Sequence, residues 1–281
     1  EIRLSLVGSE MCIRDSGWTV DGEGKAMHKS LGNGVDPADV FNENGADILR
    51  LWAASADYHA DVRCSKEIFK QLSQNYLKFR NTCKFMLDNL VDFDPEKLTK
   101  PEDMPVLDRW LLTKLNELIE KAEQSYCDYE FHIITHAVND FCVNTLSSFY
   151  LDIVKDRLYC EGAESATRRS AQTALYLTLH TLSKLFAPIL AFTCDEIWLA
   201  MPHTGDDDAR NVVLNEMNKP FTAYALDSET MARWEHIIAV RTVVNGALEE
   251  ARAAKVIGKS LEAKVILSCE GELLDFVGSV K

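Results

Sequence analysis

The stretch "SKEIFKQLSQNYLKFRNTCKFMLDNL", residues 65–90, decides the fold class of this chain. Its apolar residues recur every three or four positions, which is the period of a helix with one buried face. Ser65, with an acidic residue two positions later, is a suitable N-cap. The stretch therefore predicts one long amphipathic helix, with an apolar face made by Ile68, Phe69, Leu72, Tyr76, Phe79, Cys83, Met86, Leu87 and Leu90.

The same period returns downstream of a proline-rich segment, residues 92–105, which is predicted to be a loop. One long helix is expected from about Val106, another from about Glu130, and a fourth over residues 165–186, where Pro188 ends or kinks it. Several long amphipathic helices joined by short connections are typical of a helical bundle. The sequence therefore predicts a mainly α fold.

Shorter or less regular elements flank this bundle. Asp36 followed by proline predicts a helix start, and residues 46–56 read as a second short helix. After the bundle, residues 228–255 predict a fifth long helix, and "LEAKVILS", residues 261–268, alternates like a strand. A helix and then a strand suggest the opening of a small α/β unit. We expect the chain to be truncated at both ends.

Composition narrows the functional class. The chain has 281 residues, 47% of them hydrophobic, and a formal net charge of −14, which argues against nonspecific coating of nucleic acid or membrane. No apolar run approaches a membrane span, and no signal peptide is recognisable. The cysteines form no CxxC pair, so reduced thiols in a cytosolic protein are expected and a zinc cluster is not. They are Cys12, Cys64, Cys83, Cys127, Cys142, Cys160, Cys194 and Cys269.

The stretch "DGEGKAMHKSLGN", residues 21–33, has the composition of a ligand-binding loop. Its glycines allow close backbone approach and movement, Lys25 and Lys29 suit phosphate, and His28 and Ser30 add hydrogen-bond donors. It is not the P-loop pattern. A flexible loop of this kind can close over a triphosphate. The alternative that the residues leave open is a solvated surface turn.

"KAMHKSLGN", followed by "VDP", resembles the KMSKS signature loop of class I aminoacyl-tRNA synthetases. The second lysine of that signature falls on Lys29, its methionine on Met27 and its final serine on Ser30. Ala26 and His28 depart from it, and Lys25 stands one position before the missing lysine. The longer stretch around the loop is similar to that of isoleucyl-tRNA synthetases.

The resemblance to isoleucyl-tRNA synthetases covers residues 17–281 in collinear order. Valyl- and leucyl-tRNA synthetases share the loop and the bundle, but "ADYHADVR", residues 56–63, and the stretch 249–265 favour isoleucine. Further matching stretches are "GADILRLWAASADYHADVRCS", "YLKFRNTCKFMLDNL", "DRWLLTKLNELI", "FYLDIVKDRLYC" and "LFAPILAFTCDEIW". Residues 1–16 match nothing that follows in style and are expected to be a non-native leader.

The resemblance implies a domain order. Residues 17–64 would be the end of a Rossmann-type catalytic domain, carrying the ATP loop and a region that contacts the tRNA stem. Residues 65–225 would be the anticodon-binding bundle, and residues 226–281 the start of a C-terminal junction domain.

The resemblance also implies an activity: ATP-dependent activation of isoleucine and its transfer to tRNA(Ile). The implied ATP-binding residues are Lys25, Met27, His28, Lys29 and Ser30, and the implied catalytic residue is Lys29, which stabilises the leaving pyrophosphate. Mg²⁺ would accompany ATP, and zinc is not expected. The intact enzyme would be a cytoplasmic monomer without a membrane partner. Since the other half of the ATP site and the amino-acid pocket are missing, this chain alone is expected to be inactive.

Local basic patches on an acidic chain are the candidate tRNA contacts. For each of them the alternative is a solvated helix face or an ion pair with a nearby aspartate. The candidates are Arg80, Lys84, Arg109, Lys114, Lys155, Arg157, Arg168 and Arg169. Aromatic residues such as Phe79, Trp110, Phe149 and Tyr150 could stack on bases, but their places in apolar stripes favour core packing. His132, His136 and His180 lack a second ligand at metal spacing and are expected to be structural.

Three alternatives to the isoleucyl assignment stay open. The first is a piece of a valyl- or leucyl-type synthetase. The second is a non-catalytic helical module that binds tRNA or protein and keeps a vestigial loop. The third is a helical scaffold with no role in nucleic-acid binding. Binding of tRNA at low salt discriminates the last of these from the others.

Overall fold

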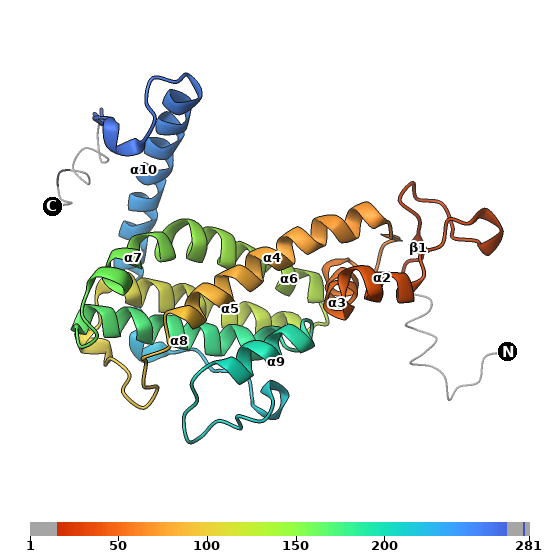
Figure 1. The fold of residues 1–281 in the computed structure, drawn as a ribbon, viewed down its shortest axis with the longest axis horizontal. Helices are drawn as coiled ribbons and strands as arrows, with labels where there is room; N and C mark the ends of the chain where they lie inside the picture. The colour runs from red at the N-terminus through yellow and green to blue at the C-terminus, as the bar shows by residue number, and fades with distance from the viewer. Residues whose placement is uncertain (1–15, 269–277, 279–281) are drawn as a thin grey trace. The chain divides into compact units, whose positions relative to one another are not determined.

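The computed structural model describes residues 16–268 and 278, and helices dominate this part of the chain (Figure 1). The prediction of a mainly α fold is confirmed. The α-helices are α2 Pro37–Asn44, α3 Ala46–Ser55, α4 Lys66–Asp88, α5 Val106–Cys127, α6 Phe131–Asp140, α7 Leu151–Cys160, α8 Ala166–Phe186, α9 Ala191–Ala200 and α10 Ser228–Ala253. A π-helical segment, η4, spans Phe141–Tyr150, and short 3₁₀ turns are η2 Lys29–Leu31, η3 Pro101–Asp103, η5 Val212–Leu214, η6 Thr222–Tyr224 and η7 Ser260–Glu262.

Local sequence sets where the early helices begin. Ser65 accepts a hydrogen bond from the backbone N–H of Ile68 and caps α4, as predicted. Asp36 likewise accepts from Ala38 N at 2.9 Å, and Pro37 occupies the first turn of α2.

The chain divides into two compact units, residues 1–226 and residues 227–281.

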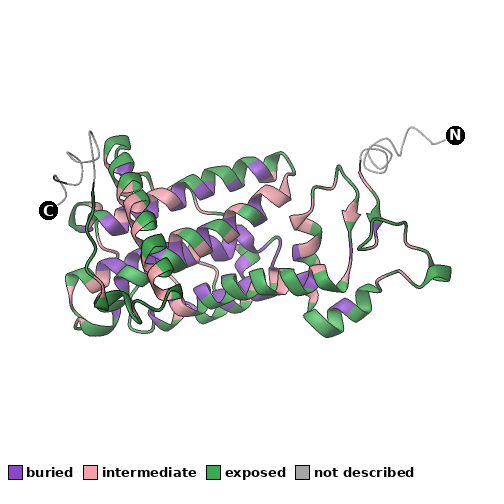
Figure 2. Cartoon of the chain, turned by 90° about the horizontal axis from the view of Figure 1, so that it is seen from above, coloured by how far each residue is buried: buried purple, intermediate pink, exposed green. Residues whose placement is uncertain are grey.

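The core of the first unit is built around α8. Residues 170–187 are buried throughout except for the half-buried His180, because this helix carries small and apolar side chains on every face. It packs against α4, α5, α7 and α9. Figure 2 shows how buried residues concentrate on the helices of this bundle, with exposed residues on their outer faces. Some polar residues inside α8 are satisfied locally, as where the Ser183 hydroxyl donates to the carbonyl of Leu179 at 2.7 Å, whereas the hydroxyls of Tyr176 and Thr178 are buried without a partner among the described residues.

The helix predicted from Glu130 is one continuous run of three segments, α6, η4 and α7. Its start near Glu130 was predicted correctly, but its central ten residues form a π-helix. A π-helix pairs residues five apart, which keeps Phe141 and Leu146 both buried in the core. Each hydrogen bond of a π-helix spans one residue more than in an α-helix. The apolar pattern does not reveal this difference, because it fits an α-helix nearly as well as a π-helix.

A small sheet lies at the N-terminal side of the described residues. Strand β1, Thr19–Val20, runs parallel to β2, Val62–Arg63, with Thr19 opposite Val62 and Val20 opposite Arg63. Next to it, α2, α3 and α4 enclose a small core of Val40, Ile48, Cys64 and Phe69. This core anchors the glycine-rich loop, which connects β1 to α2.

Two side chains on α3 attach this region to the bundle. Asp47 is buried and accepts from the backbone N–H of Thr193 at 2.8 Å and from its hydroxyl at 2.6 Å, in the first turn of α9. One turn later, Arg50 donates to the carbonyls of Pro188 and Ile189 at 2.7 and 2.9 Å, where α8 has ended. The two ends of the α8–α9 connection are therefore both held by α3.

In the second unit, α10 begins at a cap in which Asp227 accepts from Thr230 N at 2.8 Å. The strand predicted over residues 261–268 is wrong. Residues 260–262 form η7, and residues 263–268 have no regular structure. A strand needs a partner for its backbone groups, and among the described residues the only paired strands are β1 and β2. Leu261 and Ile266 accordingly stay 97% and 77% exposed.

Within the described residues, no helix combines the length and the apolar character that crossing a membrane requires.

Candidate functional site

The glycine-rich loop is held closed at its base by two side chains. Asp21 accepts from the backbone N–H groups of Glu23 and Lys25 at 3.0 and 2.8 Å, and from the Asn33 amide at 2.8 Å. Asn33 also accepts from His28 N at 2.9 Å and donates to the carbonyl of Ala26 at 3.1 Å. These backbone and amide donors favour the carboxylate, so the pKa of Asp21 is lowered. The loop base is thus fixed while its tip projects.

Two glycines of the glycine-rich loop have backbone angles that other residues rarely adopt. Gly24 has φ of 87° and closes the turn after Asp21. Gly32 has φ of 62° and ends η2, donating its N–H to the carbonyl of Lys29. Lys29 therefore lies between two glycines with positive φ angles, and it begins a single 3₁₀ turn.

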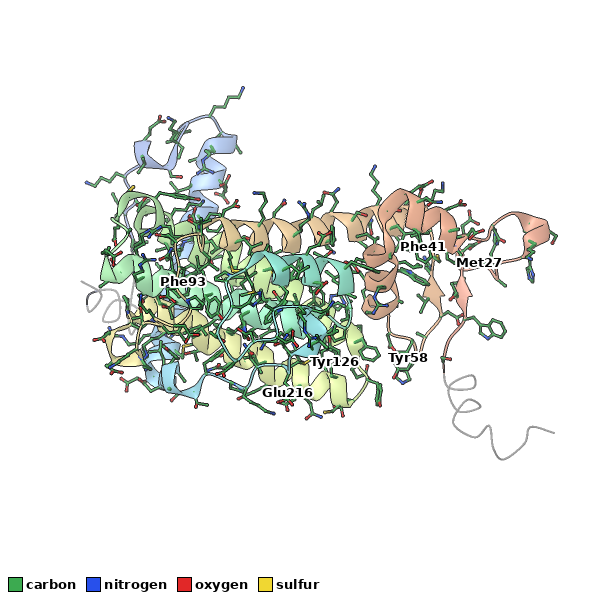
Figure 3. All side chains as sticks on the ribbon, turned by 60° about the horizontal axis from the view of Figure 1, so that its bottom comes forward. Met27, Phe41, Tyr58, Phe93, Tyr126 and Glu216 are labelled. Carbon is green, nitrogen blue, oxygen red and sulfur yellow. The ribbon has the colours of Figure 1, made fainter. Side chains whose placement is uncertain are left out.

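The five loop residues predicted to bind ATP have different environments. Met27 is half-buried against the small core and works as an anchor (Figure 3). Lys25, His28, Lys29 and Ser30 are exposed. Lys25 pairs with Glu23 at 2.7 Å, whereas Lys29 has no ion-pair or hydrogen-bond partner for its side chain among the described residues. Lys29 is therefore the loop lysine that can meet a ligand without first giving up a partner.

The loop fits the phosphates of a nucleotide better than it fits a metal ion. Its exposed donors are cationic or hydroxylic, and its carboxylates already have partners, Asp21 with backbone and amide donors and Glu23 with Lys25. In the part of the chain that the structure describes, no three His, Cys, Asp or Glu side chains come together as metal ligands.

Three of the candidate tRNA-binding residues form ion pairs within their own helices. Lys84 pairs with Asp88 at 2.8 Å, Lys114 with Glu117 at 3.0 Å, and Lys155 with Asp152 at 3.1 Å. The pairs of Lys84 and Lys155 are exposed, so they contribute little free energy and can exchange for a ligand, whereas Lys114 is half-buried. Their proposed contacts with tRNA stay predictions.

Two candidate arginines hold the fold together. Arg109 donates to the carbonyls of Tyr224 and Ala225 at 3.2 and 2.7 Å, which ties the segment before α10 to α5. Arg157 approaches the buried carboxylate of Asp108 at 3.3 Å. Tyr150 and Ser170 also donate to that carboxylate, at 2.8 and 2.6 Å. Burial nevertheless outweighs these partners, and the pKa of Asp108 is raised.

Arg168 and Arg169 both meet Asp92 in the loop after α4. Arg168 forms a two-bond pair with the carboxylate, at 2.6 and 3.0 Å, and Arg169 donates to the carbonyl of Asp92 at 2.7 Å. The Arg168 hydrogen bonds are the largest cause of a pKa near 2 for Asp92. These two arginines therefore have a structural role that the sequence did not reveal, because Asp92 is more than seventy positions away.

This pair makes stability depend on pH. The folded-state pKa of Asp92 is lowered from 3.8 to about 2, so its contribution is fully present above about pH 4 and is lost as pH falls through 2. At neutral pH, we expect Asp92→Asn to have a lower urea midpoint than the unmodified chain. As the pH is lowered from about 4 towards 2, the two midpoints should converge. Curves that stay parallel between about pH 4 and pH 2 would contradict this role for Asp92.

Arg80 differs from the other candidates. It is exposed on α4 and forms no ion pair or hydrogen bond within the described part of the chain. Two further exposed lysines on α4, Lys70 and Lys78, share this property and were missed in the sequence. A search for basic residues without an acidic residue three or four positions away would have favoured Lys78 and Arg80.

The aromatic candidates are buried in the core, as expected, whereas the three histidines differ: His132 lies 3.3 Å from Glu130 and His136 is exposed. Trp110 and Phe149 are buried, with ring centroids 4.9 Å apart, and Phe79 and Tyr150 are also buried. His180 lies 2.9 Å from a carboxylate oxygen of Asp207. The cysteines of the described region that carry free thiols are Cys64, Cys83, Cys127, Cys142, Cys160 and Cys194; of these, Cys127 and Cys160 are exposed.

Comparison with known families matches both ends of the chain. The family model for the anticodon-binding domain of tRNA ligases matches residues 108–267, and that for class I tRNA synthetases (I, L, M and V) matches residues 12–65.

Similar curated proteins agree with these matches. The chain is 49% identical to the isoleucine–tRNA ligase of Moorella thermoacetica over 93% of its own length, and 48% identical to that of Thermoanaerobacter sp. over 92%. It spans 28% of the length of each relative. A solved structure, the ternary complex of Agrobacterium radiobacter K84 agnB2 LeuRS with tRNA and LeuAMS, matches with a TM-score of 0.57. That match covers 75% of this chain and 24% of the LeuRS chain at 19% identity, so it speaks for the fold alone.

Proposed function

The chain belongs to the anticodon-binding domain family of tRNA ligases, and from this premise we propose that it is the part of an isoleucine–tRNA ligase that supplies the ATP loop and binds tRNA(Ile). The observation that carries the proposal is that one chain combines two features. Lys29, on a loop with a fixed base, is exposed and has no partner among the described residues, and the helical bundle matches this family. The isoleucine–tRNA ligases that resemble it at 47–49% identity support the choice of amino acid.

The proposed role of Lys29 follows from charge. In the formation of an aminoacyl-adenylate, the carboxylate of isoleucine attacks the α-phosphorus of ATP and pyrophosphate leaves. Negative charge grows on the leaving oxygens, and a preorganised cation near them lowers the barrier. Lys29 can take this role because no acidic side chain of the described region neutralises it, whereas Lys25 is held by Glu23. His28 and Ser30 would add donors to the same phosphates.

We assign residues 17–64 to the end of the catalytic domain, residues 65–225 to the tRNA-binding bundle and residues 226–281 to the start of a junction domain. ATP would bind with Mg²⁺. The intact enzyme would act as a cytoplasmic monomer on isoleucine and tRNA(Ile). A non-catalytic tRNA-binding module is the second candidate, and the unpartnered Lys29 speaks for a working loop over a vestigial one.

Binding of tRNA tests this proposal in the chain as it stands. Fluorescence anisotropy of a labelled tRNA(Ile) transcript at low salt should give saturable binding, and the affinity should fall steeply as salt rises. A transcript with a substituted anticodon should bind more weakly. Failure of both transcripts to bind a folded chain would contradict the tRNA-binding role.

A further inference from the structure

Helix α4 lies outside both family matches, between residues 12–65 and residues 108–267. Its length, about 35 Å at 1.5 Å per residue, connects the two regions that those matches describe. At its start, Phe69 belongs to the small core beneath the loop, and further along Phe79, Cys83 and Met86 are buried in the bundle. Figure 1 shows α4 running from the α2–α3 region along the bundle.

The charge of α4 is opposite to that of the chain. It carries five basic and two acidic residues, a formal charge of +3, while the whole chain carries −14. Helix α8 also has three basic residues, but two are paired with Asp92 and the third, Lys184, is buried. The positive charge of α4 is therefore much more accessible to a ligand than that of α8.

Three of the five basic residues on α4 form no ion pair within the described region, although Lys70 contributes to the lowered pKa of Glu67, one turn before it on the same helix. Lys70, Lys78 and Arg80 are exposed, and Glu196, which shares a shallow hollow with Arg80, forms no ion pair with it. Lys66 and Lys84 do form pairs, at 3.3 and 2.8 Å, but these pairs are more than half exposed and water screens them.

We propose that the exposed face of α4, defined by Lys70, Lys78 and Arg80, is a contact surface for the phosphates of the RNA that the bundle binds. The proposal rests on the tRNA-binding function proposed above. A nucleic-acid backbone fits this face better than a protein does, because protein interfaces depend on apolar or aromatic anchors and are depleted in lysine. The one large apolar side chain that α4 exposes is Leu77, at 40%.

The test uses the 281-residue chain with a triple substitution, Lys70→Gln, Lys78→Gln and Arg80→Gln. Its control carries Lys97→Gln, Arg210→Gln and Lys219→Gln, which removes the same charge from exposed residues paired with Asp94, Asp208 and Glu123. Circular dichroism confirms that both variants keep their helix content. Binding of a tRNA(Ile) transcript is then measured over a series of salt concentrations.

Each lost phosphate contact lowers the slope of log affinity against log salt by about 0.7–0.9. We expect the α4 variant to lose about two to three units of slope and at least tenfold affinity at low salt, while the control keeps both within error. If the α4 variant matches the control while the unmodified chain binds, the α4 surface is wrong and the tRNA-binding function stands. If the unmodified chain does not bind, both proposals fail.

Discussion

Replacing Lys29 by alanine should reduce formation of isoleucyl-adenylate by about 10²–10³-fold, which is the usual loss when one preorganised group that stabilises developing charge is removed. Because the chain spans 28% of the length of the Moorella thermoacetica ligase, the variant is made in a fusion of residues 17–281 to the preceding part of that ligase, which is 49% identical over the shared region. Isoleucine-dependent exchange of pyrophosphate into ATP reports the rate.

Lys25→Ala is the matched control for this experiment. It removes the same charge from the same loop, but Lys25 must first give up its exposed ion pair with Glu23, at 2.7 Å, to meet a phosphate. We therefore expect a much smaller loss of exchange rate than for Lys29→Ala. Equal losses for the two variants would mean that general loop charge, and not the position of Lys29, supports the reaction. An unchanged rate in Lys29→Ala would remove the catalytic role altogether.

Replacing Asp108 by alanine should lower the free energy of unfolding by about 3–5 kcal/mol, the range observed when one partner of a buried charged pair is removed. The carboxylate is fully buried and is bonded to Tyr150, Ser170 and Arg157. Its loss leaves a charged guanidinium and two hydroxyls without their acceptor. Urea denaturation of the 281-residue chain measures the effect.

The control for Asp108 is Asp94→Ala, which removes an exposed carboxylate paired with Lys97 and should change the free energy of unfolding by less than about 1 kcal/mol. If Asp108→Ala costs no more than this control, the buried network does not stabilise the bundle. Asp108→Asn, which keeps the shape and one acceptor oxygen, should fall between the two.

The helices could be predicted because burial imposes a period on their sequence. Apolar spacing placed α4 and α8 and showed that one helical run extends beyond Glu130, and the capping residues Ser65 and Asp36 act as expected. The strand predicted over residues 261–268 is wrong because alternating apolar residues indicate one face of a strand but do not supply a neighbouring strand to pair with it. The π segment escaped detection because one extra residue per turn barely changes the apolar pattern.

The candidate site was predictable in its residues but not in their partners. Lys29 could be placed in an exposed loop from the glycines around it, but the Asp21–Asn33 contact that fixes the loop base spans twelve positions and leaves no pattern. The same holds for Arg168 with Asp92, and for Asp47, which caps a helix almost 150 positions later. Long-range pairing decides which basic residues remain free to meet a ligand, and only the fold reveals it.

Aminoacylation by the unmodified fusion protein tests the central claim most directly: this chain completes an isoleucine–tRNA ligase. Charging of tRNA(Ile) is followed with labelled isoleucine, and with labelled valine and leucine as alternatives. We predict that isoleucine is attached to tRNA(Ile) by the fusion, and by neither of its halves alone. A folded fusion that charges no tRNA, or that prefers valine or leucine, would contradict the account.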